Sequence, residues 1–168
     1  MQFSTAILQK IYGIDETRMN MTDLEAMQAA LAEARAAGEA GEVPIGAVVV
    51  QDGTILAGGQ NRTLRDTDPT AHAEIICIRE AAKALGNYRL TGCSLFVTLE
   101  PCAMCAGAMI HARLDRLVFA ASDPKSGACG SVLSVLNHPQ LNHKIAVEQE
   151  ILADEASELL RSFFRERR

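Results

Sequence analysis

From residue 22 onward, blocks of apolar and polar positions predict helices and strands in turn. Residues 22–25 (TDLE) fit a capping box, in which the Thr22 hydroxyl and the Glu25 carboxylate each accept a hydrogen bond from a free backbone N–H. The alanine-rich run after them favours a helix to about residue 37, where Gly38 and Gly41 end it. The pattern therefore predicts a helix that caps its own start.

The following apolar runs predict strands alternating with helices. Residues 44–50 are rich in β-branched side chains, which is typical of a buried strand, and residues 52–53 (DG) are a hairpin signal before a return strand at 54–59. The other predicted elements are a polar loop at 61–70, helices at 71–85, 101–111 and 152–164, and strands at 94–98, 116–121 and 144–148. Pro101 is expected at a first helical position, which proline favours. This order predicts an α/β domain with helices on the faces of a mixed five-stranded sheet.

The length of 168 residues suits one domain with its own core. Residues 1–20 precede the predicted helix start and are expected to form a poorly ordered extension, so a single domain is expected over residues 21–168. The N-terminal stretch lacks the basic and long apolar segments of a secretory signal, and no run approaches the roughly 18 apolar residues of a membrane span. We therefore expect a cytoplasmic protein without a membrane partner.

The net charge of −5 argues mildly against a nucleic-acid partner. Its distribution weakens that argument, because residues 1–42 hold three basic and seven acidic side chains, whereas residues 161–168 hold four arginines and one glutamate. The C-terminal arginines are compatible either with a solvated helix end or with contacts to RNA phosphates.

Three features in the sequence point to metal chemistry: residues 72–74 (HAE), Pro101 before Cys102, and a second cysteine at position 105. Cys102 and Cys105 lie three residues apart and so share one face of a helix, and the positive end of a helix dipole favours thiolates in its first turn. One histidine and two cysteines are soft ligands that suit tetrahedral zinc. Catalytic zinc sites use three protein ligands and keep one position for water, so this set is predicted to be catalytic.

Glu74 is the predicted proton carrier. It can take a proton from a metal-activated water, pass it to a ring nitrogen of the substrate, and then protonate the amine that leaves as ammonia. The pattern H-x-E…P-C-x-x-C is the signature of the zinc-dependent deaminases.

Less specific interpretations remain for each piece. A lone H-x-E is more often a helix surface pair, and a lone C-x-x-C can be a redox pair or half of a structural zinc site. The five cysteines make a disulfide framework unlikely in this context. A structural zinc would need a fourth ligand, for which the candidates are Cys77, Cys93, Cys129 and His111.

Over residues 42–168 the chain resembles the bacterial tRNA-specific adenosine deaminases, a branch of the cytidine-deaminase-like superfamily. The matching stretches are 42–50 (EVPIGAVVV), 68–75 (DPTAHAEI), 87–90 (NYRL), 98–113 (TLEPCAMCAGAMIHAR), 119–131 (FAASDPKSGACGS), 137–145 (NHPQLNHKI) and 151–168 (ILADEASELLRSFFRERR). The resemblance implies a three-layer α/β/α fold and hydrolysis of adenosine to inosine at the wobble position of a tRNA anticodon stem-loop. It also implies a homodimer with one Zn²⁺ in each subunit.

The resemblance carries roles to individual residues. It implies His72, Cys102 and Cys105 as zinc ligands and Glu74 as the proton shuttle. The implied substrate contacts are Asn61, Ala73, Asp123, Lys125 and Ser126. Without the resemblance, residues 123–126 would be interpreted as a turn after a strand.

Two other functions compete with this one. The first is a zinc deaminase of a free base or nucleoside such as guanine, cytosine or cytidine, which pocket shape rather than motif would distinguish. The second is a zinc-stabilised binding module without turnover.

Overall fold

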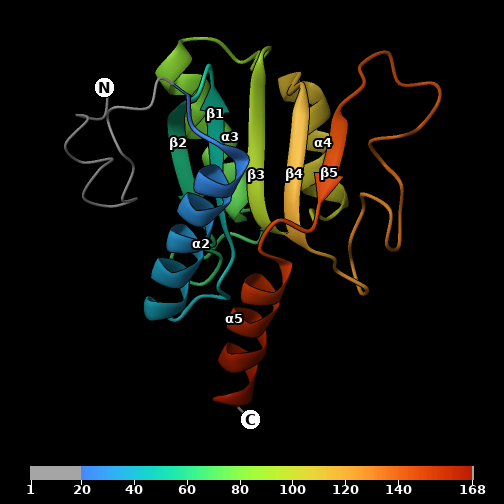
Figure 1. Cartoon of the computed structure of the whole chain (residues 1–168). Coiled ribbons are helices and arrows are strands. Elements are labelled where there is room, and N and C mark those ends of the chain that lie inside the picture. Colours follow the sequence, from blue (N-terminus) through green and yellow to red (C-terminus); the bar gives the residue numbers. More distant parts are fainter. Residues whose placement is uncertain (1–19, 168) are drawn as a thin grey trace.

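The computed structural model describes residues 20–167. Its elements, labelled as in Figure 1, follow in the order α2 (Asp23–Glu39), β1 (Gly46–Gln51), β2 (Thr54–Gln60), α3 (Ala73–Leu85), β3 (Cys93–Leu99), α4 (Ala103–Ala112), β4 (Arg116–Ala121), β5 (Ala146–Gln149) and α5 (Ala153–Arg165). The predicted extension at 1–20 lies outside the described residues except for its last position. No helix within residues 20–167 is long and apolar enough to cross a membrane.

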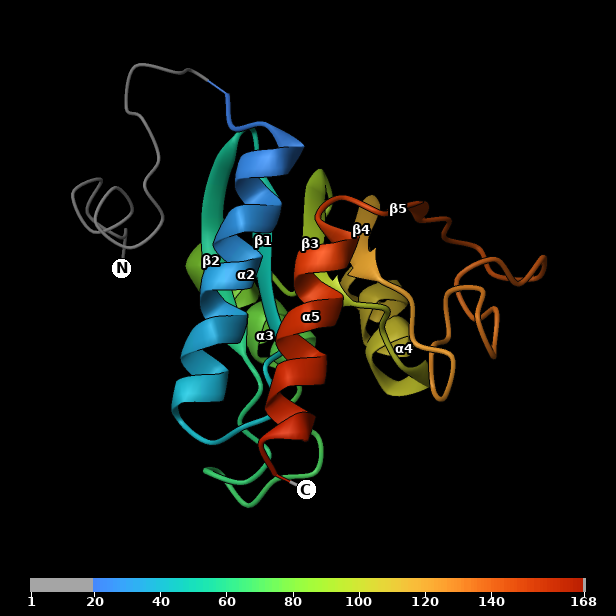
Figure 2. The ribbon, with the colours of Figure 1, turned by 60° about the horizontal axis from the view of Figure 1, so that its bottom comes forward.

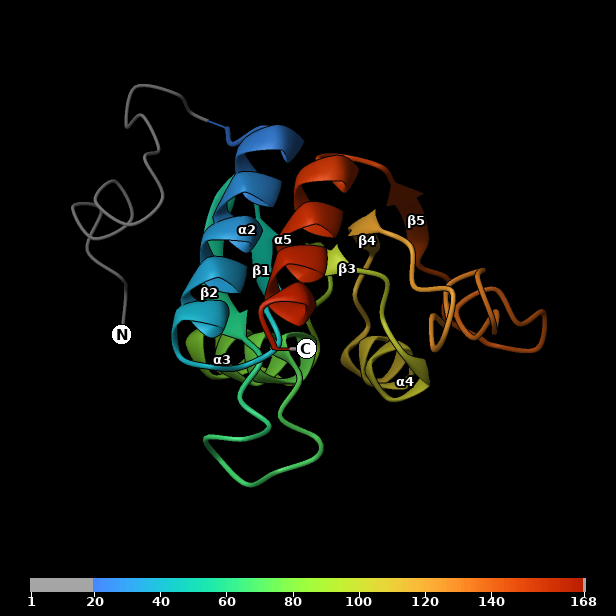
Figure 3. The same ribbon diagram turned by 90° about the horizontal axis from the view of Figure 1, so that it is seen from below.

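The five strands form one mixed sheet in the order β2-β1-β3-β4-β5. Strand β1 is antiparallel to both β2 and β3, while β4 and β5 run parallel to β3. Figure 3 shows the sheet between two layers of helices, with α2 and α5 on one face and α3 and α4 on the other. The mixed five-stranded sheet and the three-layer arrangement predicted from the sequence are therefore confirmed.

The two faces bury separate apolar clusters. Alternation along β1 sends Ala47 and Val49 toward α3 and α4, and Val48 and Val50 toward α2. Helices α2 and α5 lie side by side over the second cluster, as Figure 2 shows. This period-2 alternation is what a strand buried on both faces requires.

Two glycines bring helix backbones into contact with the sheet. A Cβ on Gly46 of β1 would lie 2.2 Å from the Ala30 carbonyl oxygen of α2. A Cβ on Gly59 of β2 would lie 2.4 Å from the Ala73 carbonyl oxygen of α3. Because each distance is shorter than a Cβ contact allows, both helices can sit at these positions only over a residue without a side chain.

The observed element ends differ from the predicted ones by up to two residues, and one difference matters for the site. Pro101 was expected to begin a helix, but α4 begins at Ala103 and Cys102 is its N-cap in extended conformation. Similarly, α3 begins at Ala73 and His72 is its N-cap. Two of the three candidate ligand residues, His72 and Cys102, are thus the last extended residues before their helices, and Cys105 lies in the first turn of α4.

Candidate active site

The candidate site lies at the carboxyl end of β3, where α3 and α4 both begin. Cys102 follows the end of β3 by three residues and caps α4, and His72 caps α3. Neither side chain makes a capping hydrogen bond to its own helix. Both side chains are therefore available to each other and to a ligand.

His72, Cys102 and Cys105 form a compact group whose ligand atoms all lie within 4.8 Å of one another. The Nδ1 atom of His72 lies 3.7 Å from the Cys102 sulfur and 3.6 Å from the Cys105 sulfur. A tetrahedral zinc ion with ordinary Zn–S and Zn–N bonds would hold these atoms about 3.5 Å apart. The three side chains thus fit a Zn²⁺ ion in both chemistry and spacing.

The protonation of the two thiols favours a cation between them. Hydrogen bonds from Cys105 and His72 lower the pKa of Cys102 to about 3, so its sulfur is a thiolate at neutral pH. The pKa of Cys105 is raised by its hydrogen bond to Cys102 and by burial. The hydrogen bond to Cys102 also raises the pKa of His72. Thiolate and neutral imidazole are the forms that bind zinc. A metal ion bound between the three side chains would therefore take the place of the protons that now form hydrogen bonds between them.

Glu74 lies in the first turn of α3 and is only 4% exposed. Burial raises the pKa of its carboxyl, although its own backbone N–H and the charge of His72 act in the opposite direction. Glu74 and Cys102 also influence each other electrostatically. A carboxyl group held beside the ligand cluster with a raised pKa can carry a proton, which is what a general acid–base requires.

The candidates for a fourth metal ligand do not join the cluster. In the described residues, the group of side chains spaced to hold a metal at this site consists of His72, Cys102 and Cys105. Cys77 is fully buried in α3 and donates to the Ala57 carbonyl oxygen, and Cys93 is buried at the start of β3. Three ligands favour the catalytic form of a zinc site over the structural form.

The predicted substrate contact Asn61 follows β2 directly and is 6% exposed. Its Nδ2 atom donates to the Glu42 carboxylate at 3.4 Å and to the Thr63 hydroxyl at 3.5 Å. Ala73, the first residue of α3, is fully buried. The loop after Asn61 returns to His72, since the Arg62 N–H donates to the Ala71 carbonyl oxygen.

The other predicted substrate contacts lie together in the loop after β4. The Asp123 carboxylate accepts hydrogen bonds from the backbone N–H groups of Lys125 and Ser126 and from the Ser126 hydroxyl. One residue further, Gly127 forms an isolated β-bridge with Cys102. This bridge brings the loop against the segment that carries a candidate zinc ligand.

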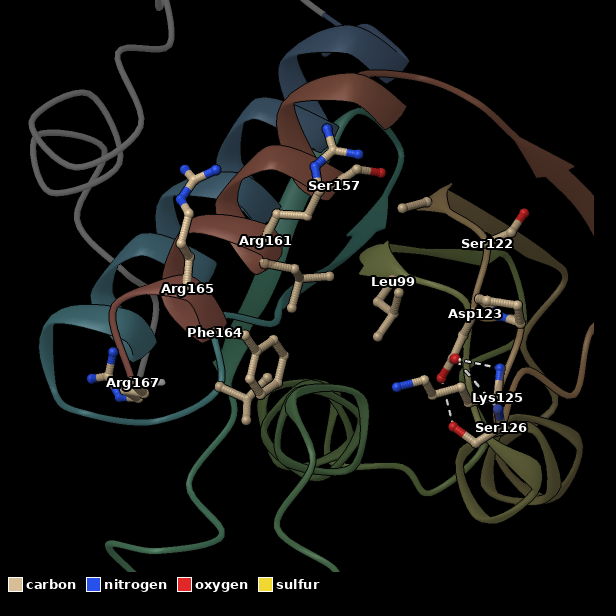
Figure 4. Close-up of a pocket in the computed structure, with 14 residues that line it drawn as sticks. Leu99, Ser122, Asp123, Lys125, Ser126, Ser157, Arg161, Phe164, Arg165 and Arg167 are labelled. Carbon is tan, nitrogen blue, oxygen red and sulfur yellow. Dashed lines mark hydrogen bonds between the residues drawn. The ribbon is translucent and has the colours of Figure 1, made fainter.

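A pocket of about 940 Å³ lies between this loop and α5. The pocket does not include the ligand cluster, because its lining contains none of the three ligands and not Glu74. Figure 4 shows Arg161, Phe164 and Arg165 of α5 on one wall and Asp123–Ser126 on the other, with the Lys125 amine reaching into the space between. The pocket is lined by more basic than acidic side chains.

Sequence reasoning did not single out two buried acids beside the site, Glu42 and Glu100. Glu42 is fully buried, and Glu100 is 3% exposed. A usable signal was present, because both acids lie within two residues of a predicted apolar strand, at 41–44 (GEVP) and 98–101 (TLEP). A charged residue beside a buried strand needs hydrogen-bond partners.

Comparison with known proteins gives consistent matches. Residues 21–168 match the family of MafB19-like deaminases. A tRNA-specific adenosine deaminase of Agrobacterium fabrum is 51% identical over 142 residues, covering 84% of this chain and 93% of the relative. A structure from a study of A-to-I editing by tRNA:A34 deaminases at the wobble position has 50% identity and a TM-score of 0.78, covering 80% of this chain and 98% of that one. A guanine deaminase from Nitrosomonas europaea has 27% identity and a TM-score of 0.73, covering 96% and 93%.

Proposed function

Because this chain belongs to the MafB19-like deaminases and, among them, to the tRNA-specific adenosine deaminases, we propose that it hydrolyses an adenosine to inosine at the wobble position of a tRNA anticodon loop. The observation that carries the proposal is the buried Glu74 beside the group of His72, Cys102 and Cys105. Hydrolytic deamination consumes one water and releases one ammonia, so the site must bind water, move its protons and accept a purine base.

His72, Cys102 and Cys105 would hold one Zn²⁺ in each subunit. When bound, Zn²⁺ supplies Lewis-acid activation of a water molecule at neutral pH. His72 and Cys102 are the N-caps of α3 and α4, and Cys105 lies in the first turn of α4. Because both helices pack on the same sheet, the three ligands would hold the metal at a fixed place in the fold.

Glu74 moves the protons. Its carboxylate accepts one proton from the attacking water and delivers it to a ring nitrogen of adenine as the carbon–oxygen bond forms. The remaining proton of that oxygen then passes through the same carboxylate to the amino group, and the carbon–nitrogen bond breaks to release ammonia. Burial supports this role, because it raises the pKa of Glu74 and so favours the uptake of a proton from the attacking water.

The pocket between α5 and residues 123–126 is the proposed path of the RNA next to the target base. Lys125, Arg161, Arg165 and Arg167 line it with positive charge. Part of that charge is balanced, since Arg161 and Arg165 both pair with Glu158. Phosphate groups could replace Glu158 as their partner, because arginine binds phosphate through two parallel hydrogen bonds. The acidic net charge of the chain therefore does not exclude RNA.

The assembly and location are part of the same proposal. The resemblance implies a homodimer that holds the anticodon stem-loop across both subunits, with the target adenosine turned out of the loop and into the site. The proposed substrate also implies a cytoplasmic enzyme, since this is where tRNA is used.

Deamination of free guanine is the second candidate, and the similarity to a guanine deaminase favours it specifically. Identity to that enzyme is 27%, against 51% and 50% for the tRNA-directed relatives. The two functions share the zinc chemistry and differ in what the pocket must accept.

One experiment separates them. Purified protein with quantified zinc is incubated with an anticodon stem-loop carrying adenosine at the wobble position, and separately with guanine, cytosine and cytidine. We expect inosine in the RNA and no ammonia from the free bases or the nucleoside. Turnover of guanine with the RNA unchanged would overturn the tRNA substrate and keep the zinc mechanism. No turnover by the zinc-loaded protein on any of these substrates would favour a binding module instead.

A further inference from the structure

We propose that Glu42 and Glu100 are positioning residues, each a buried carboxylate that gathers the hydrogen-bond donors of one loop and fixes that loop beside the zinc ligands. The loops are residues 61–65, which begin with Asn61, and residues 123–131, which contain Asp123, Lys125 and Ser126. This inference rests on the proposed function, because these residues matter for catalysis only if the two loops contact the substrate.

Both carboxylates lie at the same end of the sheet. Glu42 precedes β1 and Glu100 follows β3, and these two strands are antiparallel neighbours. The Gly46 N–H at the start of β1 donates to the Thr98 hydroxyl near the end of β3. The start of α3 and the start of α4 lie at this end too, so each acid is placed between the sheet and one loop of the site.

Glu42 binds four of the five residues 61–65. Its carboxylate accepts hydrogen bonds from the backbone N–H groups of Leu64 at 3.2 Å and Arg65 at 2.7 Å. It also accepts from the Thr63 hydroxyl and the Asn61 amide, and the Arg65 guanidinium lies 3.6 Å away. The loop has no regular secondary structure at these positions, so these bonds define its shape.

Glu42 also fixes which way the Asn61 amide faces. A carboxylate can only accept, so the Asn61 NH₂ must point toward it. The side-chain oxygen of Asn61, Oδ1, accepts no hydrogen bond from the described residues, whereas its backbone oxygen accepts one from the Arg65 guanidinium. Glu42 therefore presents Asn61 to the substrate as a hydrogen-bond acceptor, which selects a donor on the bound nucleoside.

Glu100 collects its partners from the longer loop. One carboxylate oxygen accepts from the backbone N–H groups of Cys129 and Ser131, both at 3.0 Å. The other accepts from the Asp123 N–H at 3.0 Å and from the Ser131 hydroxyl. No cation pairs with Glu100 among the described residues, so four uncharged donors from this one loop satisfy it.

The loop is shaped to close around Glu100. A Cβ on Gly127 would lie 2.4 Å from the Glu100 carboxyl carbon, so the backbone can approach this closely only without a side chain. The Ala128 N–H donates to the Pro101 carbonyl oxygen, and Gly127 bridges Cys102. Glu100 thus joins the substrate loop to the segment that carries a candidate zinc ligand.

The test uses two isosteric variants, Glu42→Gln and Glu100→Gln, in the zinc-loaded full-length protein. Glutamine keeps the volume but turns one acceptor oxygen into an NH₂ donor, which then faces another donor. Backbone hydrogen exchange is measured by peptide along the whole chain, together with zinc content and with kcat and KM on the anticodon stem-loop. Each variant is the control for the other, because both acids are buried and they hold different loops.

We expect Glu100→Gln to speed exchange in residues 123–131 about tenfold or more and to leave residues 61–65 unchanged, and Glu42→Gln to do the reverse. Zinc content should remain that of the wild type. The KM of Glu100→Gln should rise about ten- to a hundredfold with a smaller change in kcat, because a displaced loop weakens substrate placement. Should either variant fail to fold, Ser131→Ala and Thr63→Ala each remove one donor and should give the same two patterns with smaller amplitude.

Exchange that rises evenly along the chain, or does not rise in either loop, overturns the proposal, as do unchanged kinetics with a loosened loop. A wild-type protein without activity on the stem-loop would instead remove the proposed function. The exchange patterns would still be measured in that case, so the two failures are distinguishable.

Discussion

Helix α2 begins with Thr22 and Glu25, whose side chains accept from free N–H groups at the helix start, whereas the N-cap residues of α3 and α4, His72 and Cys102, make no side-chain capping hydrogen bond. The start of α2 lies at the other end of the sheet from the site, beside the β1–β2 turn and Arg116 at the start of β4. On one face of the sheet the first helical turn is therefore used for stability, and on the other it is used to present ligands. A helix N-terminus offers free N–H groups in every case, and the side chain at the N-cap decides how they are used.

The largest expected loss of activity comes from removing a candidate zinc ligand at the start of α4. Cys102→Ala leaves two ligands, which is too few to hold zinc, so we expect zinc and activity to be lost together. Metal analysis of the purified variant and the stem-loop assay measure both. Cys93→Ala, which changes a buried cysteine away from the site, should retain zinc, and full zinc occupancy in Cys102→Ala would mean that the ligand set is wrong.

The next effect separates chemistry from metal binding on the same face. Glu74→Gln keeps the side-chain volume and removes the proton carrier, so we expect activity to fall about 10²- to 10⁴-fold while zinc stays bound. Single-turnover rates with the stem-loop, together with zinc analysis, measure the change. Activity within tenfold of the wild type would falsify the role of Glu74 as proton shuttle.

The C-terminal half of α5 differs from both helix starts, because it contributes arginines to the pocket. In a double variant, Arg161 and Arg165 are both replaced by glutamate. We expect the KM for the stem-loop to rise about tenfold with kcat nearly unchanged. The slope of the logarithm of the binding constant against the logarithm of the salt concentration should become shallower by about two. Titrations at several salt concentrations measure this. Arg79→Glu, on the exposed side of α3, is the control, and an equal loss in both variants would argue against the pocket as the RNA path.

Gly46 and Gly59 allow the two faces of the sheet to be compared, because Gly46 lies under α2 and Gly59 lies under α3. Gly59→Ala and Gly46→Ala each force a helix off the sheet, and we expect each to cost about 1–3 kcal/mol in the free energy of unfolding. Only Gly59→Ala should also reduce activity, about tenfold or more at a temperature where both variants are folded, because it displaces the first turn of α3 that carries Glu74. Equal activity losses would show that the faces are not independent.

The smallest expected effect is at the start of α2. Thr22→Ala removes one side of the capping box and should lower the free energy of unfolding by about 1 kcal/mol, measured by urea denaturation. Zinc content and kcat should match the wild type. A loss of zinc in this variant would contradict the division between the two helix starts.

The helices, the strands and the candidate ligands could be predicted from the sequence because each depends on local signals. Apolar periodicity specifies which residues a strand or helix buries, and the short motifs at residues 72–74 and 101–105 mark the candidate ligands even though His72 and Cys102 are 30 residues apart. Pro101 was misplaced because proline favours a first helical position, whereas here Cys102 must stay extended to turn its sulfur toward His72. The helix therefore begins two residues later than the propensity of proline indicates.

The roles of Glu42 and Glu100 could not be predicted in the same way. Their partners lie 19 to 31 residues further along the chain, in loops without periodic patterns. The pocket is equally non-local, because its walls come from a loop after β4 and from a helix that follows β5. Such features depend on how the strands are ordered in the sheet, which the motif does not encode.

The strand order leaves β5 at an edge of the described sheet, where a strand exposes backbone groups that can pair with another chain. Strand β5 has four residues, and Glu148 within it forms an ion pair with Arg116 of β4. A short edge that carries a charged pair is a poor template for a foreign strand. The strand that leads the chain into α5 therefore makes this edge of the described sheet unfavourable for edge-to-edge pairing.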